Sequence, residues 1–183
     1  VSAPEELTSE DIDALERLYE AAIAFTGDQI QRLFTRLATD GRLDETLVVV
    51  TSDHGELFGD YDQYGKPERM YDELLHVPLW VAGGPDSLAD ATDDLVSLLD
   101  LPPTIHDALG VPVPDAYEGR RLGVDDPREY VLAEHEVGGE VVVGARSQTC
   151  LYEADEIRGE RRLFDCRDGF QSVNADDSVP GAE

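Results

Sequence analysis

Lysine is almost absent from this sequence: Lys66 is the one lysine among 14 basic residues, and all the others are arginine. A lysine kept at one position indicates a role that a guanidinium group does not fill. The ammonium group is a compact point charge, which suits a single contact with an oxyanion. Lys66 is therefore a candidate anion-binding residue.

Positive charge is scarce as well. The chain has 41 acidic and 14 basic residues, which gives a net charge of -27. Such a field repels nucleic acid and anionic membranes, so neither is an expected partner. With its scarcity of lysine, the acidic composition resembles the salt-adapted proteomes of halophilic archaea. The 41% of hydrophobic residues, placed in periodic segments, excludes a disordered chain.

Long apolar runs are also missing. No segment approaches the roughly 20 apolar residues that span a membrane, and no basic and apolar signal sequence is visible. This favours a cytoplasmic location, although Val1 leaves open a start further upstream. Cys150 and Cys166 lack the spacing of metal sites, and we interpret them as reduced thiols rather than as a disulfide.

The first half of the sequence predicts an α/β layered fold. Thr8 and Ser9 precede apolar residues spaced three and four apart as far as Leu37, which predicts a long amphipathic helix that ends at Gly41. Residues 46–51 are rich in β-branched side chains and predict a strand buried on both faces. A buried strand after a helix is typical of a parallel sheet.

The later segments extend this organisation. We expect a short helix at residues 71–75, a second strand of the same sheet at residues 77–82, and a helix that ends at Gly110. Four short strand-like pieces then predict a small antiparallel sheet: residues 130–132, 141–146, 149–152 and 162–164. The predicted domains are residues 1–125, the α/β part, and residues 126–183, which end in an acidic tail from residue 173 that we expect to fray.

Asp53 and His54 directly follow the first predicted strand, where ligands gather in such folds. Gly55 permits a turn that aims both side chains at one ion. A carboxylate suits calcium or magnesium, and an imidazole extends the choice to manganese or zinc. The dipeptide alone is also compatible with a solvated aspartate and a hydrogen-bonded histidine. The spacing of thirteen residues from Asp53 to Lys66 favours the metal site.

Lys66 lies between Gly65 and Pro67, in a loop that can fold back over the metal. There its ammonium would hold an oxygen of a bound sulfate or phosphate and stabilise developing charge. His76 precedes the second strand, and without the fold a packing or hydrogen-bonding role is favoured over a substrate contact. We interpret Glu56 as a solvated residue outside the site, although an orienting role for it stays open.

Several segments together resemble the C-terminal half of the sulfatase family, which belongs to the alkaline phosphatase superfamily. The main ones are residues 46–56, residues 65–66 and residues 76–79. Further similarity lies in residues 99–105, 110–115, 119–122 and 162–165. The resemblance covers nearly the whole chain. It implies an α/β class, with the C-terminal part of a sulfatase-like layered sheet fold followed by a small antiparallel sheet.

Sulfatases hydrolyse sulfate esters with a formylglycine, made from Cys or Ser in a Cys/Ser-x-Pro-x-Arg motif, and with a divalent cation held by four side chains. The resemblance implies that Asp53 and His54 are two of the metal ligands, and that the ion is calcium in preference to magnesium or manganese. It implies that Lys66 is catalytic, because it would bind the sulfate and assist the leaving oxygen. His76 stands where family members carry Arg or His, which implies a substrate contact.

The nucleophile motif itself is absent from this chain. Its nearest approach is residues 2–6, Ser-Ala-Pro-Glu-Glu, which end in glutamate. The paired aspartates near the amino end of full-length members are missing too. We therefore expect this chain to be inactive alone, as the C-terminal portion of a longer sulfatase or a split product. Its N-terminal half or a partner chain would carry the formylglycine.

Two other functions stay open. A phosphodiester or phosphonate monoester hydrolase of the same superfamily would use the same Asp-His and Lys elements. Alternatively, the chain is a non-catalytic remnant or a partner subunit that supplies a metal half-site. Whether this chain by itself is an enzyme is therefore not decided by its sequence.

Overall fold

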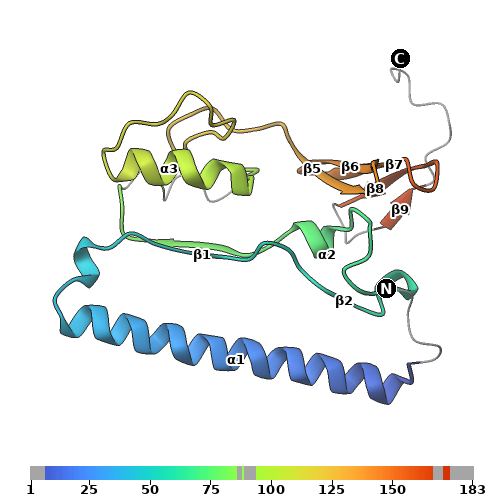
Figure 1. Cartoon of the computed structure of the whole chain (residues 1–183), viewed down its shortest axis with the longest axis horizontal. Helices are drawn as coiled ribbons and strands as arrows, with labels where there is room; N and C mark the ends of the chain where they lie inside the picture. Colours follow the sequence, from blue (N-terminus) through green and yellow to red (C-terminus); the bar gives the residue numbers. More distant parts are fainter. Residues whose placement is uncertain (1–6, 86–87, 89–93, 167–170, 174–183) are drawn as a thin grey trace. The chain divides into compact units, whose positions relative to one another are not determined.

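The computed structural model describes residues 7–85, 88, 94–166 and 171–173. It groups the chain into two compact units, the first formed by Val1–Pro67 with Val77–Gly83 and the second by Glu68–His76 with Gly84–Glu183. Helices and strands occur in both units (Figure 1), so the predicted α/β class is confirmed. The predicted domain boundary after residue 125 stays a prediction. The part of the predicted acidic tail that follows Val173 lies outside the described residues.

The first unit begins with the helix α1, Ser9–Thr39. The hydroxyl of Thr8 accepts a hydrogen bond from the backbone N–H of Asp11, and the Asp11 carboxylate accepts one in return from the backbone N–H of Thr8. This capping box fixes the start of the helix. Gly41, with φ of 69°, takes the left-handed conformation after the end. Both predicted ends of this helix are therefore confirmed.

Two strands of the first unit form a small sheet. β1, Val48–Thr51, pairs with β4, Leu79–Ala82, so the prediction that both strands share a sheet is confirmed. The pairing is antiparallel, however, and the predicted parallel arrangement is wrong for this pair. A parallel return needs a crossover of about a dozen residues or more, usually a helix. The connection between β1 and β4 holds only short elements, the longest being α2, Asp72–Leu75.

Burial of these strands is also lower than predicted. Val48, Val49 and Val50 are half-buried and Thr51 is exposed, whereas the sequence predicted a strand buried on both faces. The Trp80 side chain on β4 is 50% exposed. An apolar run predicts that a strand packs against other residues, but it does not identify those residues.

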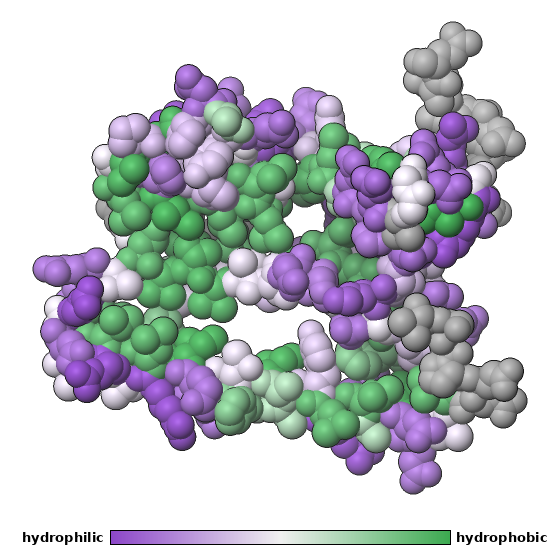
Figure 2. Space-filling view, in the orientation of Figure 1, coloured by the Kyte–Doolittle hydropathy of each residue, from purple (hydrophilic) through white to green (hydrophobic). Residues whose placement is uncertain are grey.

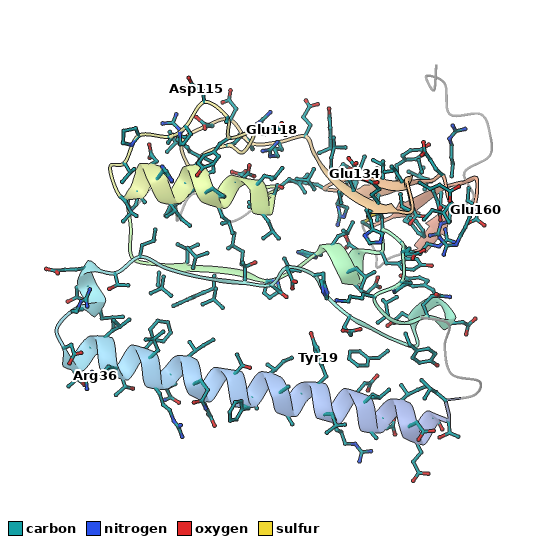
Figure 3. The ribbon with its side chains drawn as sticks, in the orientation of Figure 1. Tyr19, Arg36, Asp115, Glu118, Glu134 and Glu160 are labelled. Carbon is teal, nitrogen blue, oxygen red and sulfur yellow. The ribbon has the colours of Figure 1, made fainter. Side chains whose placement is uncertain are left out.

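Aromatic contacts connect α1 to the strands of its own unit. The ring of Tyr19, which points from α1 toward the strands (Figure 3), meets the ring of Phe58 edge to face at 5.1 Å, and Phe34 meets Trp80 at 5.8 Å. Apolar and polar residues share the surface of α1 (Figure 2), and none of its residues is buried. Within the described part of the chain, no helix has the length and apolar character needed to cross a membrane.

The second unit contains a five-stranded antiparallel sheet in the order β5-β6-β7-β8-β9. The predicted antiparallel sheet is therefore confirmed, with longer strands than the sequence indicated and one strand that it missed. The strands are β5, Tyr130–Val137; β6, Glu140–Ser147; β7, Cys150–Asp155; β8, Glu160–Asp165; and β9, Gln171–Val173.

The core of the second unit lies on one face of this sheet. Val142 and Leu151 are fully buried there, and Phe164 is 1% exposed. Met70 and Tyr71, from the segment Glu68–His76, are buried against the same face, with Tyr71 and Phe164 in an edge-to-face contact at 6.2 Å. A Cβ at Gly144 would lie 3.0 Å from the Met70 side chain, so glycine there allows the close approach.

A buried aspartate organises the rest of the second unit. Asp100 ends the short helix η4, Leu98–Asp100, directly before the helix α3, Leu101–Ala108, and is only 1% exposed. Its carboxylate accepts hydrogen bonds from the backbone N–H groups of Ser97 and Arg120 and from the guanidinium of Arg128. Burial alone would raise the pKa of Asp100, but these hydrogen bonds, above all that of Arg128, outweigh it and lower the pKa.

We expect Asp100 to make the stability of the chain depend on pH. A carboxyl whose pKa is lowered by folding contributes stability above its unfolded pKa, and this contribution is lost as the pH falls through that value toward the folded pKa. Asp100→Asn should therefore lower the free energy of unfolding at pH 7, and the deficit should shrink below about pH 5. Urea unfolding at a series of pH values measures this. If the loss in free energy of unfolding is the same at every pH, Asp100 is not the source of the pH dependence. The same conclusion holds if Asp13→Asn, at an exposed aspartate, has an equal effect.

Candidate functional site

The predicted ligands lie where the sequence placed them, directly after β1. Two local hydrogen bonds turn the chain there. The hydroxyl of Ser52 donates to the carbonyl oxygen of His54 at 2.8 Å, and the Asp53 Oδ1 accepts from the backbone N–H of His54 at 3.0 Å. Because these bonds break the extended conformation, neighbouring side chains that would otherwise point to opposite faces come together.

A small hairpin explains the spacing between Asp53 and Lys66. β2, Leu57–Phe58, pairs with β3, Tyr64–Gly65, with Leu57 opposite Gly65. Lys66 follows β3 directly, so the hairpin returns it toward the residues that precede β2. Gly65 has φ of 72°, and a Cβ there would lie 3.3 Å from the Oε1 of Glu56. Glycine at this position therefore permits both the backbone conformation and the approach of Glu56.

The side chains of Asp53, His54 and Lys66 meet at this point. The Nδ1 of His54 lies 2.8 Å from the carbonyl oxygen of Gly55, which can only accept, so Nδ1 carries the ring proton of the neutral imidazole. The bare Nε2 then lies 3.1 Å from the Lys66 Nζ and 3.7 Å from the Asp53 Oδ2. This is the tautomer that a metal-binding histidine needs.

Electrostatics keep the carboxylate of Asp53 ionised. Hydrogen bonds from backbone N–H groups, first that of Asp53 itself and then that of His54, lower the pKa of Asp53, and a protonated His54 ring would lower it further. The side chain of Asp53 is 86% exposed, so solvent screens these effects. Lys66 is exposed as well. The arrangement therefore brings together a carboxylate oxygen, an imidazole nitrogen and an exposed ammonium group.

Asp53 and His54 fit a divalent cation as two of its ligands. Their donor atoms, one hard oxygen and one imidazole nitrogen, are close enough to contact a single ion. Among the residues that the structure describes, no group of three or more His, Cys, Asp or Glu side chains is arranged so that it could hold a metal ion. Calcium takes about six to eight ligands, so other groups would have to complete its coordination.

His76 is placed differently from the other candidates. It belongs to the second unit, follows the last residue of α2, and donates its backbone N–H to the carbonyl oxygen of Asp72 at 2.7 Å. Its side chain is exposed. The structure thus groups Asp53, His54 and Lys66 in one unit and assigns His76 to the other.

The sequence interpretation missed one residue of this site. Ser52 shapes the turn that carries both ligands, and its only sequence signal is a hydroxyl residue directly before the Asp-His pair. Glu56, which we interpreted as solvated, is half-buried beside Gly65.

Comparison with known proteins identifies what this chain resembles. The model of the family described as Sulfatase matches residues 6–111, more than half of the chain and the part that holds all four predicted site residues. Among curated relatives, Arylsulfatase K from Bos taurus is 34% identical over 115 residues, which cover 63% of this chain and 21% of the relative. The "Uncharacterized sulfatase YidJ" of Escherichia coli (strain K12) is 35% identical over 116 residues, or 63% of this chain and 23% of YidJ.

Solved structures agree in fold. The phosphonate monoester hydrolase SpPMH from Silicibacter pomeroyi superimposes with a TM-score of 0.78 at 25% identity, over 96% of this chain and 40% of that protein. The regions matched in the curated relatives Arylsulfatase K and YidJ are about a fifth of the length of those two proteins.

Proposed function

The chain belongs to the sulfatase family, and on this basis we propose that it is the C-terminal portion of a metal-dependent sulfuric ester hydrolase. The proposal depends on one observation above all: His54 Nε2 lies 3.1 Å from Lys66 Nζ and 3.7 Å from Asp53 Oδ2. The nucleophile, a formylglycine in sulfatases, would come from an N-terminal half or a partner chain. The net charge of -27 supports a salt-adapted, halophilic archaeal origin.

In this proposal Asp53 and His54 hold a divalent cation, most suitably calcium, with magnesium and manganese as the other candidates. When bound, the cation supplies positive charge that stabilises anionic oxygens of the nucleophile and the ester. The hydrogen bond from Nδ1 of His54 to Gly55 selects the tautomer of the neutral ring in which Nε2 carries the lone pair, and directs Nε2 away from the backbone. The turn formed by Ser52 holds the two side chains together.

Lys66 binds the anionic ester. Its ammonium donates hydrogen bonds to a sulfate oxygen and to the oxygen that leaves, and so stabilises the charge that develops there. The lone pair of His54 Nε2 serves one partner at a time, so Lys66 contacts it only when no cation does. The exposed four-carbon stem lets the ammonium turn to the oxyanion instead. His76 is proposed as a further substrate contact.

A second candidate is hydrolysis of a phosphonate monoester or a phosphodiester. The similarity to SpPMH, which covers 96% of this chain, favours it. Asp53, His54 and Lys66 would serve either reaction, because both substrates present tetrahedral anionic oxygens. Parallel assays of reconstituted protein with an aryl sulfate and an aryl phosphonate monoester separate the two activities by their relative rates. Cation binding without turnover of either substrate would instead favour a non-catalytic partner subunit.

We expect the chain to bind calcium through Asp53 and His54. In concentrated potassium chloride, Asp53→Asn or His54→Ala should weaken the binding at least ~10-fold, because each removes one of two ligands that this chain supplies. Isothermal titration calorimetry measures the affinity, and the exposed neighbour Asp62→Asn is the matched control. The half-site loses its support if the wild-type chain binds no divalent cation, or if both ligand variants bind it as tightly as the wild type does.

A further inference from the structure

The strand β5 forms one edge of the five-stranded sheet in the second unit. Its eight residues, Tyr130–Val137, pair one to one with β6 and without a bulge. Among the residues that the structure describes, no strand pairs with the other side of β5. Proteins usually protect a long edge strand with proline, lysine or a bulge, because its free backbone groups otherwise pair with a further strand. β5 contains none of the three.

The turn between β5 and β6 determines which backbone groups face outward. Gly138 and Gly139 both have positive φ and form a two-residue turn. The residues that flank the turn, Val137 and Glu140, exchange backbone hydrogen bonds, and hydrogen-bonded pairs then alternate with unbonded pairs along the hairpin. The odd-numbered residues of β5 thus bond to β6. The N–H and C=O groups of the even-numbered residues point away from β6 and form what we call the open edge: Tyr130, Leu132, Glu134 and Glu136.

The side chains of the open edge include two large apolar groups. His135 lies opposite the buried Val142, so the odd-numbered residues of β5 face the core and the even-numbered residues face the other side of the sheet. Tyr130 and Leu132 are 57% and 63% exposed there, and both glutamates of the open edge are exposed as well. A further strand at this edge would therefore gain apolar contacts in addition to backbone hydrogen bonds.

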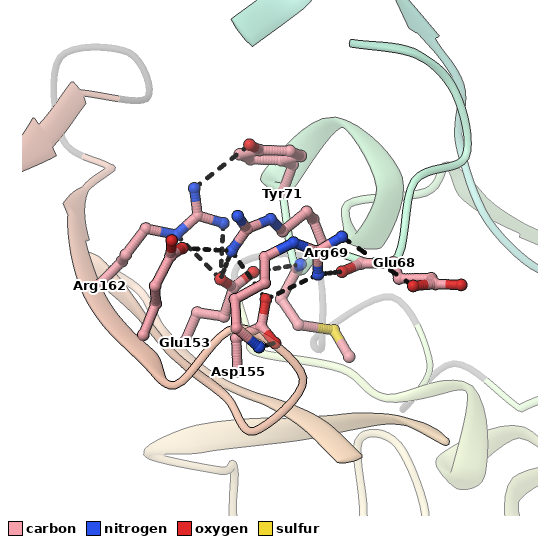
Figure 4. Close-up of polar contacts among 9 residues, drawn as sticks. Glu68, Arg69, Tyr71, Glu153, Asp155 and Arg162 are labelled. Carbon is pink, nitrogen blue, oxygen red and sulfur yellow. Dashed lines mark hydrogen bonds and ion pairs between the residues drawn. The ribbon is translucent and has the colours of Figure 1, made fainter. Parts of the chain in front are cut away.

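The core face of the sheet is covered by a segment of the chain itself. Glu153 on β7 fastens the segment Glu68–His76 to that face (Figure 4). Its Oε2 accepts the backbone N–H of Met70 at 2.7 Å, and its Oε1 pairs with the guanidinium of Arg69 at 3.2 Å. Arg162 pairs with the same carboxylate at 2.6 Å. The open edge, in contrast, is free to accept a partner.

We propose that the open edge pairs antiparallel with the open edge of a second copy of this chain, which joins two five-stranded sheets into one. The open edge is complementary to itself, because its apolar side chains lie in one half and its glutamates in the other. With Ala133 of both copies at the two-fold axis, Tyr130 lies opposite Glu136 and Leu132 opposite Glu134 of the second copy. All four residues of each edge then have backbone partners, and no two carboxylates lie directly opposite each other.

The acidic surface makes this pairing depend on salt. Each copy has a net charge of -27, so repulsion between the copies opposes their association at low ionic strength. The Debye length falls to about 3 Å at 1 M salt, which screens this repulsion and leaves the backbone hydrogen bonds and the apolar contacts in place. We therefore expect the dimer in concentrated potassium chloride. A basic partner strand would show the opposite dependence and bind more tightly as the salt is lowered.

Analytical ultracentrifugation of the 183-residue chain in concentrated potassium chloride measures the association. The wild type should sediment as a dimer and Leu132→Pro as a monomer. Proline at this position removes an N–H that points outward and leaves the bonds to β6 intact, so the variant should fold. Leu132→Glu should raise the dimer dissociation constant at least ~10-fold, because it places like charges opposite each other at two symmetric positions. It decides the result if Leu132→Pro does not fold.

Leu109→Glu is the matched control. Leu109 follows α3 in the same unit and is 62% exposed, so the substitution changes charge and apolar exposure as Leu132→Glu does, but outside β5. The dimer should be unchanged. Hydrogen exchange examines the edge in the wild type: the backbone N–H groups of the open edge should be protected in the dimer and lose this protection on dilution, whereas those of the odd-numbered residues of β5 stay protected.

Four results would overturn the proposal. They are a wild-type chain that is monomeric at every salt concentration, a dimer that persists in Leu132→Pro and Leu132→Glu, a Leu109→Glu variant that dissociates as readily as Leu132→Glu, and a dimer in which the N–H groups of the open edge exchange freely. None of these measurements needs a metal or a substrate. A chain that hydrolyses neither ester would therefore refute the proposed function and leave this inference unaffected.

Discussion

Replacing Lys66 with alanine should lower the rate of aryl sulfate hydrolysis by the reconstituted, full-length protein at least ~10²-fold, an effect comparable to the loss of one oxyanion donor. The ammonium lies 3.1 Å from His54 Nε2, at the point where the proposed cation and ester meet. Because its contribution is largest when charge develops on the leaving oxygen, the loss should appear mainly in kcat and less in KM.

Lys66→Arg is the informative control for this experiment. It keeps the positive charge but replaces a compact ammonium with a broad planar group, so it should recover only part of the activity. Lys66 is exposed, and its removal should leave the melting temperature unchanged. Turnover that is unchanged in Lys66→Ala would remove this residue from the mechanism. A lower melting temperature would assign its effect to folding instead.

The elements that the sequence predicted well are those fixed by nearby residues. The helix α1 begins at a capping box between Thr8 and Asp11 and ends before Gly41, and all three signals lie within a turn of the ends that they set. The candidate site was predictable for the same reason. Asp53, His54 and Lys66 lie within one short segment, and a hairpin is enough to bring them together.

The errors concern relations between distant segments. The β-branched run of β1 predicted a strand correctly, but its apolar side chains do not show which strand pairs with it or in which direction. The residues of β1 therefore do not predict its antiparallel pairing with β4. The anchor of Met70 on Glu153 joins residues 83 positions apart, and neither residue differs in local pattern from an ordinary surface or core residue.

Acidic residues in this chain serve two different roles that composition alone does not separate. Most of those that the structure describes are exposed, and they contribute to the charge that repels anionic partners. Asp100, Glu153 and Asp155 are instead buried and paired with arginines. Because arginine offers a planar, multidentate group, its dominance over lysine suits these buried pairs. The lone lysine, Lys66, lies instead at the exposed end of the hairpin, where the proposed function requires a single contact with an oxyanion.

Gly119→Ala should destabilise the second unit by about 3 kcal/mol or more. A Cβ at Gly119 would lie far inside the van der Waals contact distance to the Leu99 carbonyl oxygen and 3.0 Å from the Cα of Asp100. These are backbone atoms, so no side-chain rotation relieves the overlap. The chain would have to move apart, and the hydrogen bond of 2.7 Å from the Arg120 N–H to Asp100 would be lost with it.

Gly27→Ala supplies the opposite case in the same chain. Gly27 lies inside α1, and a Cβ there would meet nothing within 4 Å. Alanine should therefore stabilise the helix by about 0.5–1 kcal/mol, because it reduces the backbone entropy lost on folding. Urea unfolding in concentrated potassium chloride measures both variants. If Gly119→Ala instead lowers the free energy of unfolding no more than a typical surface substitution does, the contacts of Arg120 and Arg128 with Asp100 do not depend on the close approach of Gly119 to Leu99.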